Sequence, residues 1–499
     1  MIMSPQPPSG GGGVVVPSMN PRPGYGRSDE KEEVSDTLSE PVEVVRPGPP
    51  GVVVRGVPRV AVVLAAGRSE RLAEVTGGGS KALIRVGGLS LVERAVRSLL
   101  AAGIEHVVVV VGYQAGPVGT VVNRIAPGRV QAVLAEAWEQ GNGVSLAAAE
   151  PYVAEEDLFL LVTTDHIFGE GALAPLFGAG RPGVLVDHAP EPDAWAEGTR
   201  VRLHEEQVVA FSKQLGDPSI DCGAFLLPLD VFDAQRRTAA RGDASLAGAV
   251  TELARRRPLE AVPLPHWTWW QDVDTPEDLR RAARRLRGAL TKPTDGPIAR
   301  YLNRPLSTRL SMGLAHLPLH PDVVSLLAFL VALAGAWALA AGLGIAGALL
   351  VHASSVLDGV DGEIARLRLR TSPRGALLDG VLDRLGDAAV LGGLALWAMA
   401  EGSDPESVTL LAVAATAGAM LSMATKDRIA ALGMAPPPER WIGWLMGGRD
   451  ARLFIVAVCA VFEVPIVALA VITLTSALSL AARFLLAGVG TGGSWTGPR

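Results

Sequence analysis

The chain has 499 residues, which is long enough for two or three domains. Its formal net charge is −6, and the sequence has no basic stripe with interleaved aromatic residues, so nothing in it indicates nucleic-acid binding. The only two cysteines are Cys222 and Cys459, and this count indicates neither a disulfide framework nor a zinc site.

Composition divides the chain into segments of different character. Residues 1–57 are rich in Pro, Gly, Ser and acidic residues and are predicted to be a disordered tail, with a second short tail at 491–499. Residues 58–290 carry most of the charge and are typical of a soluble α/β domain. Residues 321–490 are dominated by Ala, Leu, Val and Gly in runs long enough to span a bilayer. We therefore expect a soluble domain followed by an integral membrane domain.

The soluble half begins with a pattern that suits phosphate binding. An apolar strand at Val60–Leu64 leads into AAGRSERL and then to Lys81. A glycine-bearing loop after a strand offers backbone N–H groups to phosphates, while Arg71 and Lys81 offer charge. The alternative is an ordinary turn between a strand and a helix. LAAGxxxRL followed by a lysine resembles the start of the nucleoside-triphosphate-binding domain of sugar-phosphate nucleotidyltransferases. That resemblance implies nucleotide contacts at Leu64, Ala65, Ala66, Gly67 and Lys81.

The next segments alternate between helix and strand patterns. Residues 90–103 are apolar at helical spacing and end at Gly103, and HVVVVVG follows as a buried strand. This alternation predicts a parallel, doubly wound, Rossmann-like sheet. Farther on, Gly141 and Asn142 belong to a small polar loop at a predicted helix start. Their role is either base or ribose recognition or plain helix capping.

Carboxylates follow two later strands. DLFLLVTTDHIF contains a predicted buried strand that ends at Asp165. The carboxyl end of such a strand is where α/β sheets bind ligands. His166 beside it is either part of the site or a structural neighbour. WWQDVDTPED places Asp272 and Asp274 at a strand end before a helix. The nucleotidyltransferase resemblance implies that Asp165 holds Mg²⁺ together with one of this later pair, and we favour Asp274.

The same resemblance implies a reaction in which an acceptor phosphate attacks the α-phosphorus of a nucleotide and releases pyrophosphate. Such a reaction needs positioning and charge neutralisation more than a nucleophilic side chain. Lys81 and Arg71 are therefore the predicted catalytic residues of this half. Lys213 and Asp221 resemble residues on the sugar-phosphate side of such domains.

Six apolar spans are predicted in the membrane half, at 322–341, 344–366, 376–399, 407–427, 451–465 and 467–487. A basic segment within 291–320, with apolar residues between Arg300, Arg304 and Arg309, is either an amphipathic helix on the membrane surface or a solvated linker. Lys and Arg residues follow the second span and lie between the fourth and fifth. The positive-inside rule therefore predicts a multi-pass membrane protein with both termini and the soluble domain in the cytoplasm.

Four aspartates lie close together in this apolar half. Asp358 and Asp361 are three residues apart, and Asp379 and Asp383 are four apart, so each pair shares one helix face. Two such helices facing each other would gather four carboxylates, which requires a cation among them. Oxygen ligands arranged in this way suit Mg²⁺ or Mn²⁺ and phosphoryl-group transfer. The alternative is a set of buried carboxylates paired with nearby arginines.

The full spacing, D-x2-D-G-x2-A-R-x8-G-x3-D-x3-D, resembles the signature of the CDP-alcohol phosphotransferase family. This implies nucleotide contacts at Gly362, Ala365, Arg366 and Gly375. Asp383 is the predicted general base toward an acceptor hydroxyl, in addition to its place among the metal ligands. Cationic residues near the fourth and fifth spans either bind the phosphate of the acceptor or anchor the protein at the membrane: Lys426, Arg428, Arg449 and Arg452.

The order of the two halves resembles one family, the bifunctional inositol-1-phosphate cytidylyltransferase/di-myo-inositol-phosphate-phosphate synthases. The resemblance covers about residues 58–490 and includes QGNGVSL, TTDH, WQDVDTPED, SSVLDGVDGEIAR and GGRDARLF. It implies that CTP and inositol-1-phosphate give CDP-inositol and pyrophosphate. CDP-inositol then joins a second inositol-1-phosphate and releases CMP, on the route to a compatible solute.

Two other functions remain open at this point. One is a CDP-alcohol phosphotransferase that makes a phospholipid headgroup, with a cytidylyltransferase for another alcohol phosphate. The other is a membrane sensor of nucleotide and metal with inactive sites, which the intact Lys81, Asp165 and four membrane aspartates argue against. Resemblance to this membrane family also implies a homodimer. We expect CDP-inositol to diffuse freely between the two sites.

Overall fold

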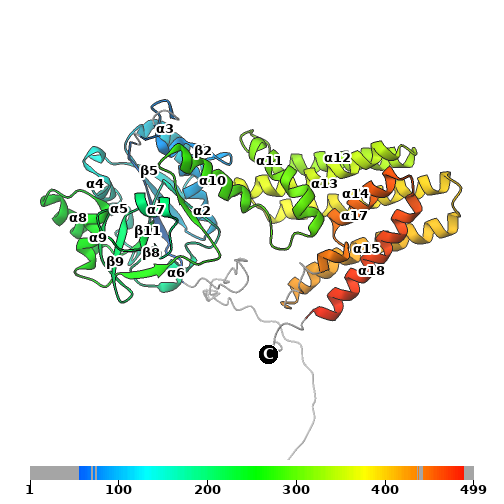
Figure 1. The fold of residues 1–499 in the computed structure, drawn as a ribbon. Coiled ribbons are helices and arrows are strands. Elements are labelled where there is room, and N and C mark those ends of the chain that lie inside the picture. The colour runs from blue at the N-terminus through cyan, green and yellow to red at the C-terminus, as the bar shows by residue number, and fades with distance from the viewer. Residues whose placement is uncertain (1–55, 69–70, 73–75, 435–436, 438–441, 488–499) are drawn as a thin grey trace, which may run out of the picture. The chain divides into compact units, whose positions relative to one another are not determined.

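The computed structural model describes residues 56–68, 71–72, 76–434, 437 and 442–487. The predicted tails at 1–57 and 491–499 lie outside these residues, apart from Gly56 and Val57. The ribbon in Figure 1 shows a domain of strands and helices, in blue to green, and a domain of helices, in green to red. The two kinds of domain predicted from composition are therefore both present.

Within the described residues, nine strands form one sheet in the order β5-β4-β1-β6-β11-β8-β12-β10-β9. In chain order these strands are β1 Val60–Ala65, β4 His106–Val111, β5 Val130–Leu134, β6 Phe159–Thr163, β8 Gly183–Asp187, β9 Arg200–His204, β10 Gln207–Ser212, β11 Ile220–Leu227 and β12 Glu260–Pro263. Two small sheets pair β2 (Arg85–Val86) with β3 (Leu89–Ser90) and β7 (His166–Phe168) with β13 (Trp270–Asp272).

The sheet is mixed, so the prediction of a parallel sheet is only partly correct. β4, β1 and β6 are parallel neighbours, as are β4 and β5 and also β8 and β12. β11 runs antiparallel to both β6 and β8, and β10 runs antiparallel to β12 and β9. The chain reaches β11 from β10 without an intervening helix. The strand–helix alternation that predicts parallel neighbours stops at this point.

Helices cover both faces of the sheet, as in a doubly wound fold. Along β1, Val60, Val62 and Leu64 join one core cluster, while Ala61, Val63 and Ala65 join the other, because successive side chains point to opposite faces. The helices of this domain are α2 Leu91–Ala101, α3 Ala115–Val122, α4 Asn142–Ala147, α5 Glu150–Val153, α6 Ala174–Ala179, α7 Pro192–Glu197, α8 Asp230–Ala240, α9 Leu246–Ala254 and α10 Pro276–Gly288.

Two helix starts follow the sequence signals closely. Ser90 caps α2 and forms a capping box with Glu93, and Thr275 caps α10 in the same way with Asp278. The Thr275 cap fixes the chain directly after β13, so Asp272 and Asp274 lie between a strand end and a helix start. This part of the prediction is confirmed.

The helical domain contains a helix over most of each predicted span. A short π-helix at Ala299–Asn303 leads into α11, and a 3-10 turn, Gly443–Leu445, precedes α17. The helices are α11 Arg304–Leu314, α12 Pro321–Ala340, α13 Gly344–Leu367, α14 Pro373–Ala400, α15 Pro405–Ala431, α17 Arg449–Val461 and α18 Pro465–Leu486. Among the described residues, α12, α15 and α18 are long and apolar enough to cross a membrane.

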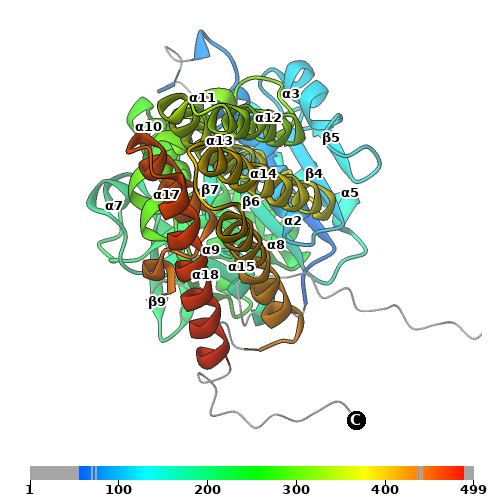
Figure 2. The ribbon, with the colours of Figure 1, turned by 90° about the vertical axis from the view of Figure 1, so that its right-hand side faces the viewer.

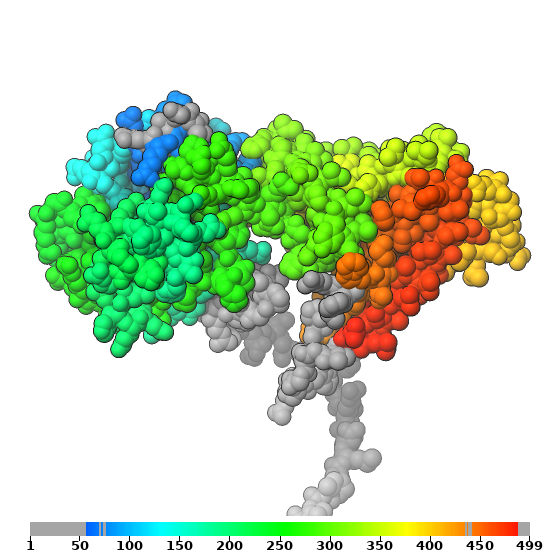
Figure 3. Space-filling model, in the orientation of Figure 1, coloured from blue at the N-terminus to red at the C-terminus, as the bar shows by residue number. Residues whose placement is uncertain are grey.

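The helices pack side by side through small residues. Figures 1 and 2 show α12, α13 and α14 together, with α15 next to α18; α12 contacts both α13 and α14, and α15 contacts α18. Gly393 of α14 faces the backbone of Ala336 of α12, where a Cβ would collide with the Ala336 carbonyl group. In the space-filling view of Figure 3, the orange and red surfaces of α17 and α18 adjoin, in agreement with their contact.

Candidate active sites

Hydrogen bonds on both sides hold the loop that follows β1. The backbone N–H of Thr164 donates to the Leu64 carbonyl at 3.1 Å, and that of Tyr113 donates to the Ala66 carbonyl at 2.9 Å. Gly67 is exposed, and the space around its missing Cβ is open. The predicted nucleotide-binding residues before it are buried at the strand end: Leu64, Ala65 and Ala66. The loop thus opens toward solvent at Gly67.

A glycine loop ahead of Lys81 is held by two residues that sequence analysis missed. The Tyr113 hydroxyl donates to the Gly78 carbonyl at 2.7 Å, and Gln114 Nε2 donates to the same carbonyl at 3.2 Å. Gln114 Oε1 accepts from the Ser80 N–H at 2.9 Å. Tyr113 and Gln114 follow the carboxyl end of β4, which is the neighbour of β1. Ligands bind at the carboxyl ends of parallel strands, so this position could have identified both residues as candidates from the sequence.

Lys81 lies between carboxylates. Its ammonium donates to Asp165 Oδ2 at 3.1 Å and also to Asp274. Arg71 lies 3.6 Å from Asp274 and 3.1 Å from Glu197. Burial alone would lower the pKa of Lys81, but the nearby carboxylates outweigh it and raise that pKa above its usual value. Lys81 is therefore a permanent positive charge, and the structure brings it together with Asp165 and Asp274.

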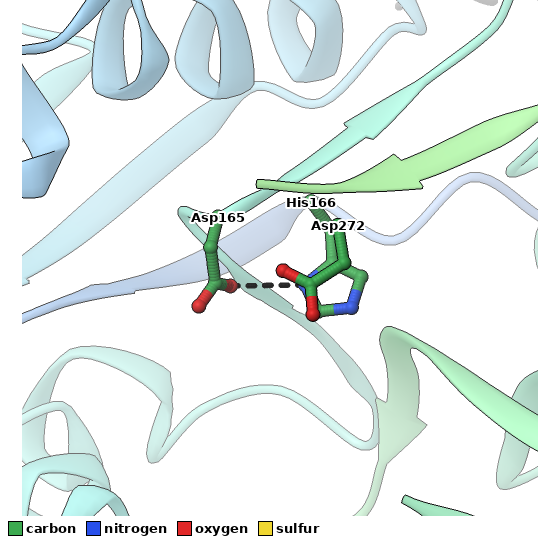
Figure 4. A group of neighbouring side chains, drawn as sticks. All are labelled: Asp165, His166 and Asp272. Atoms are coloured by element: carbon green, nitrogen blue, oxygen red, sulfur yellow. Dashed lines mark hydrogen bonds and ion pairs between the residues drawn. The ribbon is translucent and has the colours of Figure 1, made fainter. Parts of the chain in front are cut away.

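Asp165, His166 and Asp272 form the first carboxylate cluster (Figure 4). The pairing of β7 with β13 places Asp272 opposite His166, and one ligand atom from each of the three residues lies within 4.8 Å of the others. His166 Nδ1 is 2.9 Å from Asp165 Oδ1. Asp272 Oδ1 is buried and has no hydrogen-bond partner among the described residues. An unpartnered buried carboxylate oxygen fits a hard divalent cation.

The ionisable groups of this cluster interact strongly with one another. Burial raises the pKa of Asp272 to about 7, and the charges of Asp165 and Asp274 act in the same direction. Burial alone would lower the pKa of His166, but Asp272 and Asp165 raise it to about 9. Two carboxylates this close do not both ionise easily without a neutralising charge between them. His166 is thus part of the cluster.

The arrangement distinguishes the two later aspartates. Asp272 joins Asp165 and His166, whereas Asp274 is engaged by Lys81 and lies near Arg71. Our preference for Asp274 as the second ligand does not match this grouping, because the turn after β13 directs Asp274 toward the cations. We therefore propose Asp272, rather than Asp274, as the metal ligand that joins Asp165.

The loop at Gly141 and Asn142 is shaped by packing. The Asn142 side-chain oxygen accepts from the Leu246 N–H at 2.9 Å, at the start of α9. Gly141 has a φ of 141°, and a Cβ there would lie 2.6 Å from the Ala244 carbonyl oxygen. The glycine and the amide are therefore explained by the contact with residues 244–246. Their role in nucleotide binding stays a prediction.

A cavity of about 670 Å³ adjoins the first carboxylate cluster. His166 and Asp272 belong to its wall, and so do the predicted residues Lys213 and Asp221. Asp221 Oδ1 accepts from the Gly223 N–H at 2.9 Å, and burial raises the pKa of Asp221. The cavity wall therefore carries the cationic side chains Lys213, Arg281 and Arg285 beside Asp221 and other carboxylates.

A second carboxylate cluster lies in the helical domain, where α13 faces α14. Asp358, Asp379 and Asp383 each place a carboxylate oxygen within 4.8 Å of the others. The fourth predicted ligand, Asp361, is buried and accepts hydrogen bonds from the Ser325 hydroxyl and the Gly362 N–H. Three of the four predicted carboxylates are thus grouped, and oxygen ligands of this kind fit Mg²⁺ or Mn²⁺.

Arg449, the first residue of α17, reaches into the second cluster. Its Nη1 lies 2.7 Å from Asp358 and 3.2 Å from Asp383, and its Nε lies 3.0 Å from Asp387. Sequence analysis proposed Arg449 as a ligand of the acceptor phosphate and missed Asp387. The signal was present, because Asp379, Asp383 and Asp387 repeat every four residues along one helix face.

Arg452 is buried and has two partners. It donates to Asp387 Oδ2 at 2.8 Å and to the Gly447 carbonyl at 2.8 Å. We expect Arg452→Met to lower the free energy of unfolding by about 2 kcal/mol, because a buried hydrogen bond to a charged group is lost. Thermal unfolding in detergent measures this, with the exposed Arg428→Met as control. Unchanged stability together with a raised KM for the acceptor would instead make Arg452 a substrate ligand.

The remaining predicted residues lie around the second cluster. Arg366 Nη2 is 3.4 Å from the Leu290 carbonyl, and its buried Nε has no hydrogen-bond partner among the described residues. Gly375 donates its N–H to the Ser372 hydroxyl at 3.0 Å in the first turn of α14. Gly362 and Ala365 belong to α13, and Lys426 and Arg428 are exposed near the end of α15.

Comparison with known families defines the class of each domain. The family described as MobA-like NTP transferase domain matches residues 61–215, and the family described as CDP-alcohol phosphatidyltransferase matches residues 318–491. The chain is therefore a transferase that joins a nucleotidyltransferase domain to a CDP-alcohol phosphotransferase domain. Members of both families use divalent metal ions, in agreement with the two carboxylate clusters.

Whole-length relatives narrow the class to one family. A bifunctional IPC transferase and DIPP synthase from Rubrobacter xylanophilus is 39% identical over 412 residues, which cover 81% of this chain and 91% of the relative. One from Archaeoglobus fulgidus is 32% identical, covering 80% of this chain and 77% of the relative. The chain belongs to this family, as the motifs predicted. A solved inositol-1-phosphate CTP transferase from T. maritima is 26% identical, with a TM-score of 0.41 over 45% of this chain and 92% of that one.

Proposed function

We propose that this chain makes CDP-inositol from CTP and inositol-1-phosphate, and then transfers the inositol phosphate group of CDP-inositol to a second inositol-1-phosphate to give di-myo-inositol phosphate phosphate and CMP. The observation that carries the proposal is the presence of two separate carboxylate clusters, one in each domain, each with its own cation, Lys81 or Arg449. The first carboxylate cluster fits the synthesis of the CDP-activated alcohol, and the second fits the reaction that consumes it. The substrates follow from the family.

In the first reaction, a phosphate oxygen of inositol-1-phosphate attacks the α-phosphorus of CTP, and pyrophosphate leaves. Lys81 stabilises the charge that develops on the phosphates. The cavity lined by Lys213 and Asp221 holds the acceptor next to the cluster. Asp165 and Asp272 would hold Mg²⁺, which neutralises the triphosphate when bound. Arg71 would leave its exposed pair with Glu197 to contact the nucleotide.

In the second reaction, a hydroxyl of inositol-1-phosphate attacks the β-phosphorus of CDP-inositol. The new phosphodiester bond forms as the bond to CMP breaks. Asp383 accepts the hydroxyl proton, and Arg449 at 3.2 Å is placed to stabilise the anionic groups. The Asp358, Asp361, Asp379 and Asp383 carboxylates would hold Mg²⁺, or Mn²⁺ in its place. Arg366, whose Nε has no hydrogen-bond partner among the described residues, is the proposed ligand of the nucleotide phosphates.

The membrane arrangement belongs to the same proposal. We infer that the helices α12, α13, α14, α15, α17 and α18 lie in the membrane, with α13 and α14 carrying the carboxylates at the cytoplasmic side. The cationic residues that support this orientation lie from the end of α13 to the start of α14 (Arg366, Arg368, Arg370 and Arg374), at the end of α15 (Lys426 and Arg428) and at the start of α17 (Arg449 and Arg452). Modification of introduced cysteines from one side of sealed vesicles tests the orientation.

The direct test uses the purified full chain in detergent with CTP, Mg²⁺ and inositol-1-phosphate, followed by ³¹P NMR. We expect resonances of pyrophosphate, CMP and a new phosphodiester, all abolished by excess EDTA. If pyrophosphate is absent, inositol-1-phosphate is the wrong alcohol phosphate. If pyrophosphate forms but the phosphodiester appears only after a lipid alcohol is added, the membrane domain makes a phospholipid headgroup.

A further inference from the structure

The segment that precedes the membrane helices docks on α13 through polar contacts. Ser355, Gly359 and Glu363 follow one another at intervals of four and therefore share one face of α13. Residues from Asn303 to Ser311 contact this face at each of the three positions. Asp358 and Asp361, the proposed metal ligands, lie in the same two turns. The docked face and the reactive face therefore belong to the same stretch of helix.

Glu363 is the centre of the contact. Its side chain is fully buried, with Oε1 accepting from Arg304 Nη1 at 2.6 Å and from the Ser307 hydroxyl at 2.7 Å. Oε2 accepts from the Ser311 hydroxyl at 2.6 Å. A buried carboxylate is costly unless it is paired and hydrogen-bonded, and here both oxygens are satisfied by α11. These bonds leave Glu363 to hold α11 rather than a metal ion.

Arg304 extends the network toward the linker. Its Nε lies 2.8 Å from Asp295 Oδ2, so one guanidinium joins two carboxylates that are far apart in the sequence. Gly359 makes this possible, because a Cβ there would lie 2.9 Å from Arg304 Nη1. A side chain at position 359 would therefore push the arginine away from Glu363.

Asn303 connects the same segment to the helix that carries Arg449. Its Nδ2 donates to Asp450 Oδ1 at 2.6 Å and to the Ser355 hydroxyl at 3.0 Å. Asp450 directly follows Arg449, whose guanidinium reaches Asp358 and Asp383. The segment thus fixes the turn of α13 that bears the carboxylates relative to the start of α17.

The apolar side chains of this segment point the other way. Tyr301, Leu306 and Leu310 are exposed, whereas Ser307 and Ser311 are buried against α13. The polar side of residues 303–311 faces the protein, whereas the apolar contacts of α11 come near its end, where Met312 and Leu314 pack against core clusters. The hydrogen bonds and ion pairs therefore set the position of the first two turns of α11.

We propose that Asn303, Arg304 and Glu363 are positioning residues for the second reaction, in which the segment 295–311 clamps α13 against α17 and so sets the geometry of the second carboxylate cluster. This inference rests on the proposed second reaction and adds residues outside its motif. Displacement of reacting groups by about 1 Å costs on the order of 10²-fold in rate. Loosening the clamp is therefore expected to lower kcat more than it raises KM.

The test compares Glu363→Ala and Glu363→Gln in the full chain with Arg309→Met, an exposed arginine on the same helix. With CDP-inositol and inositol-1-phosphate supplied, Glu363→Ala should lower kcat per folded protein by about 10- to 100-fold. It should also raise the Mg²⁺ concentration for half-maximal rate. Glu363→Gln should retain more activity, because its amide can keep the bonds to the two serines. Pyrophosphate release by the first domain should be unchanged in all three variants.

Hydrogen exchange gives a readout that does not depend on activity. Peptides covering residues 355–367 should exchange faster in Glu363→Ala than in the wild type and Arg309→Met. Unchanged exchange together with kcat within twofold of the wild type would overturn the clamp. Faster exchange in Glu363→Ala, in a protein whose wild type lacks the second reaction, would support the clamp and refute the proposed function separately.

Discussion

Replacing Asp383 with Asn is expected to stop the chain at CDP-inositol. The variant keeps the shape of the carboxylate but cannot take a proton from the acceptor hydroxyl, and it weakens the second metal site. General-base catalysis alone contributes roughly 10²–10⁴-fold, so a loss of at least about 10³-fold is expected for the second reaction. ³¹P NMR of the reaction with CTP should show pyrophosphate and the diphosphate resonances of CDP-inositol, without CMP.

Asp427→Asn is the matched control, because Asp427 is an exposed aspartate in the same domain. It should leave both reactions at wild-type rate. The loss in Asp383→Asn must also occur at saturating Mg²⁺, since a defect that excess metal repairs would assign Asp383 to metal binding only. Formation of the phosphodiester at an undiminished rate would contradict the role given to Asp383.

Replacing Lys81 with Met is expected to slow the first reaction, the synthesis of CDP-inositol, strongly. Lys81 lies between Asp165 and Asp274, so the methionine removes the charge that the phosphates meet in the loop after β1. Loss of one such stabilising group typically costs about 10²–10³-fold in rate. Pyrophosphate release from CTP should fall by this factor, as measured with a coupled phosphate assay.

The second reaction is the internal control for Lys81→Met. Supplied with CDP-inositol, the variant should make the phosphodiester at wild-type rate, because Lys81 does not touch the second cluster. If this reaction is lost as well, the substitution has damaged the whole protein. If pyrophosphate release is unaffected, Lys81 is not the phosphate-stabilising residue.

Much of the fold was predictable because the two halves follow different physical patterns. Fully apolar runs such as Val60–Leu64 became buried strands, and runs of about 20 apolar residues became the long helices. The antiparallel course of β11 was not predictable from alternation, since it depends on which strands pair across the sheet. Of the six predicted spans, those at α12, α15 and α18 are long and apolar enough to cross a membrane, whereas α13 and α14 carry the charged motif and α17 has only 13 residues.

The candidate sites were predictable where residue spacing sets geometry. Asp358, Asp379 and Asp383 meet as their helical spacing requires, and Asp165 lies at a strand end next to Lys81. The choice between Asp272 and Asp274 depended on a turn whose direction the sequence does not reveal. Glu363 was passed over for a different reason. Its partners lie more than 50 residues away on α11, and no local pattern connects them.

The central claim is that two successive sites share CDP-inositol as their intermediate. Complementation between two variants, each lacking one of the two reactions, tests it most directly. Lys81→Met and Asp383→Asn are each incubated alone, and then together, with CTP, Mg²⁺ and inositol-1-phosphate. Neither alone should form the phosphodiester, while the mixture should, because CDP-inositol made by one protein diffuses to the other. If the mixture stays inactive although each protein retains its other reaction, the intermediate does not pass between molecules. If either variant alone makes the phosphodiester at wild-type rate, the account of two successive sites is wrong.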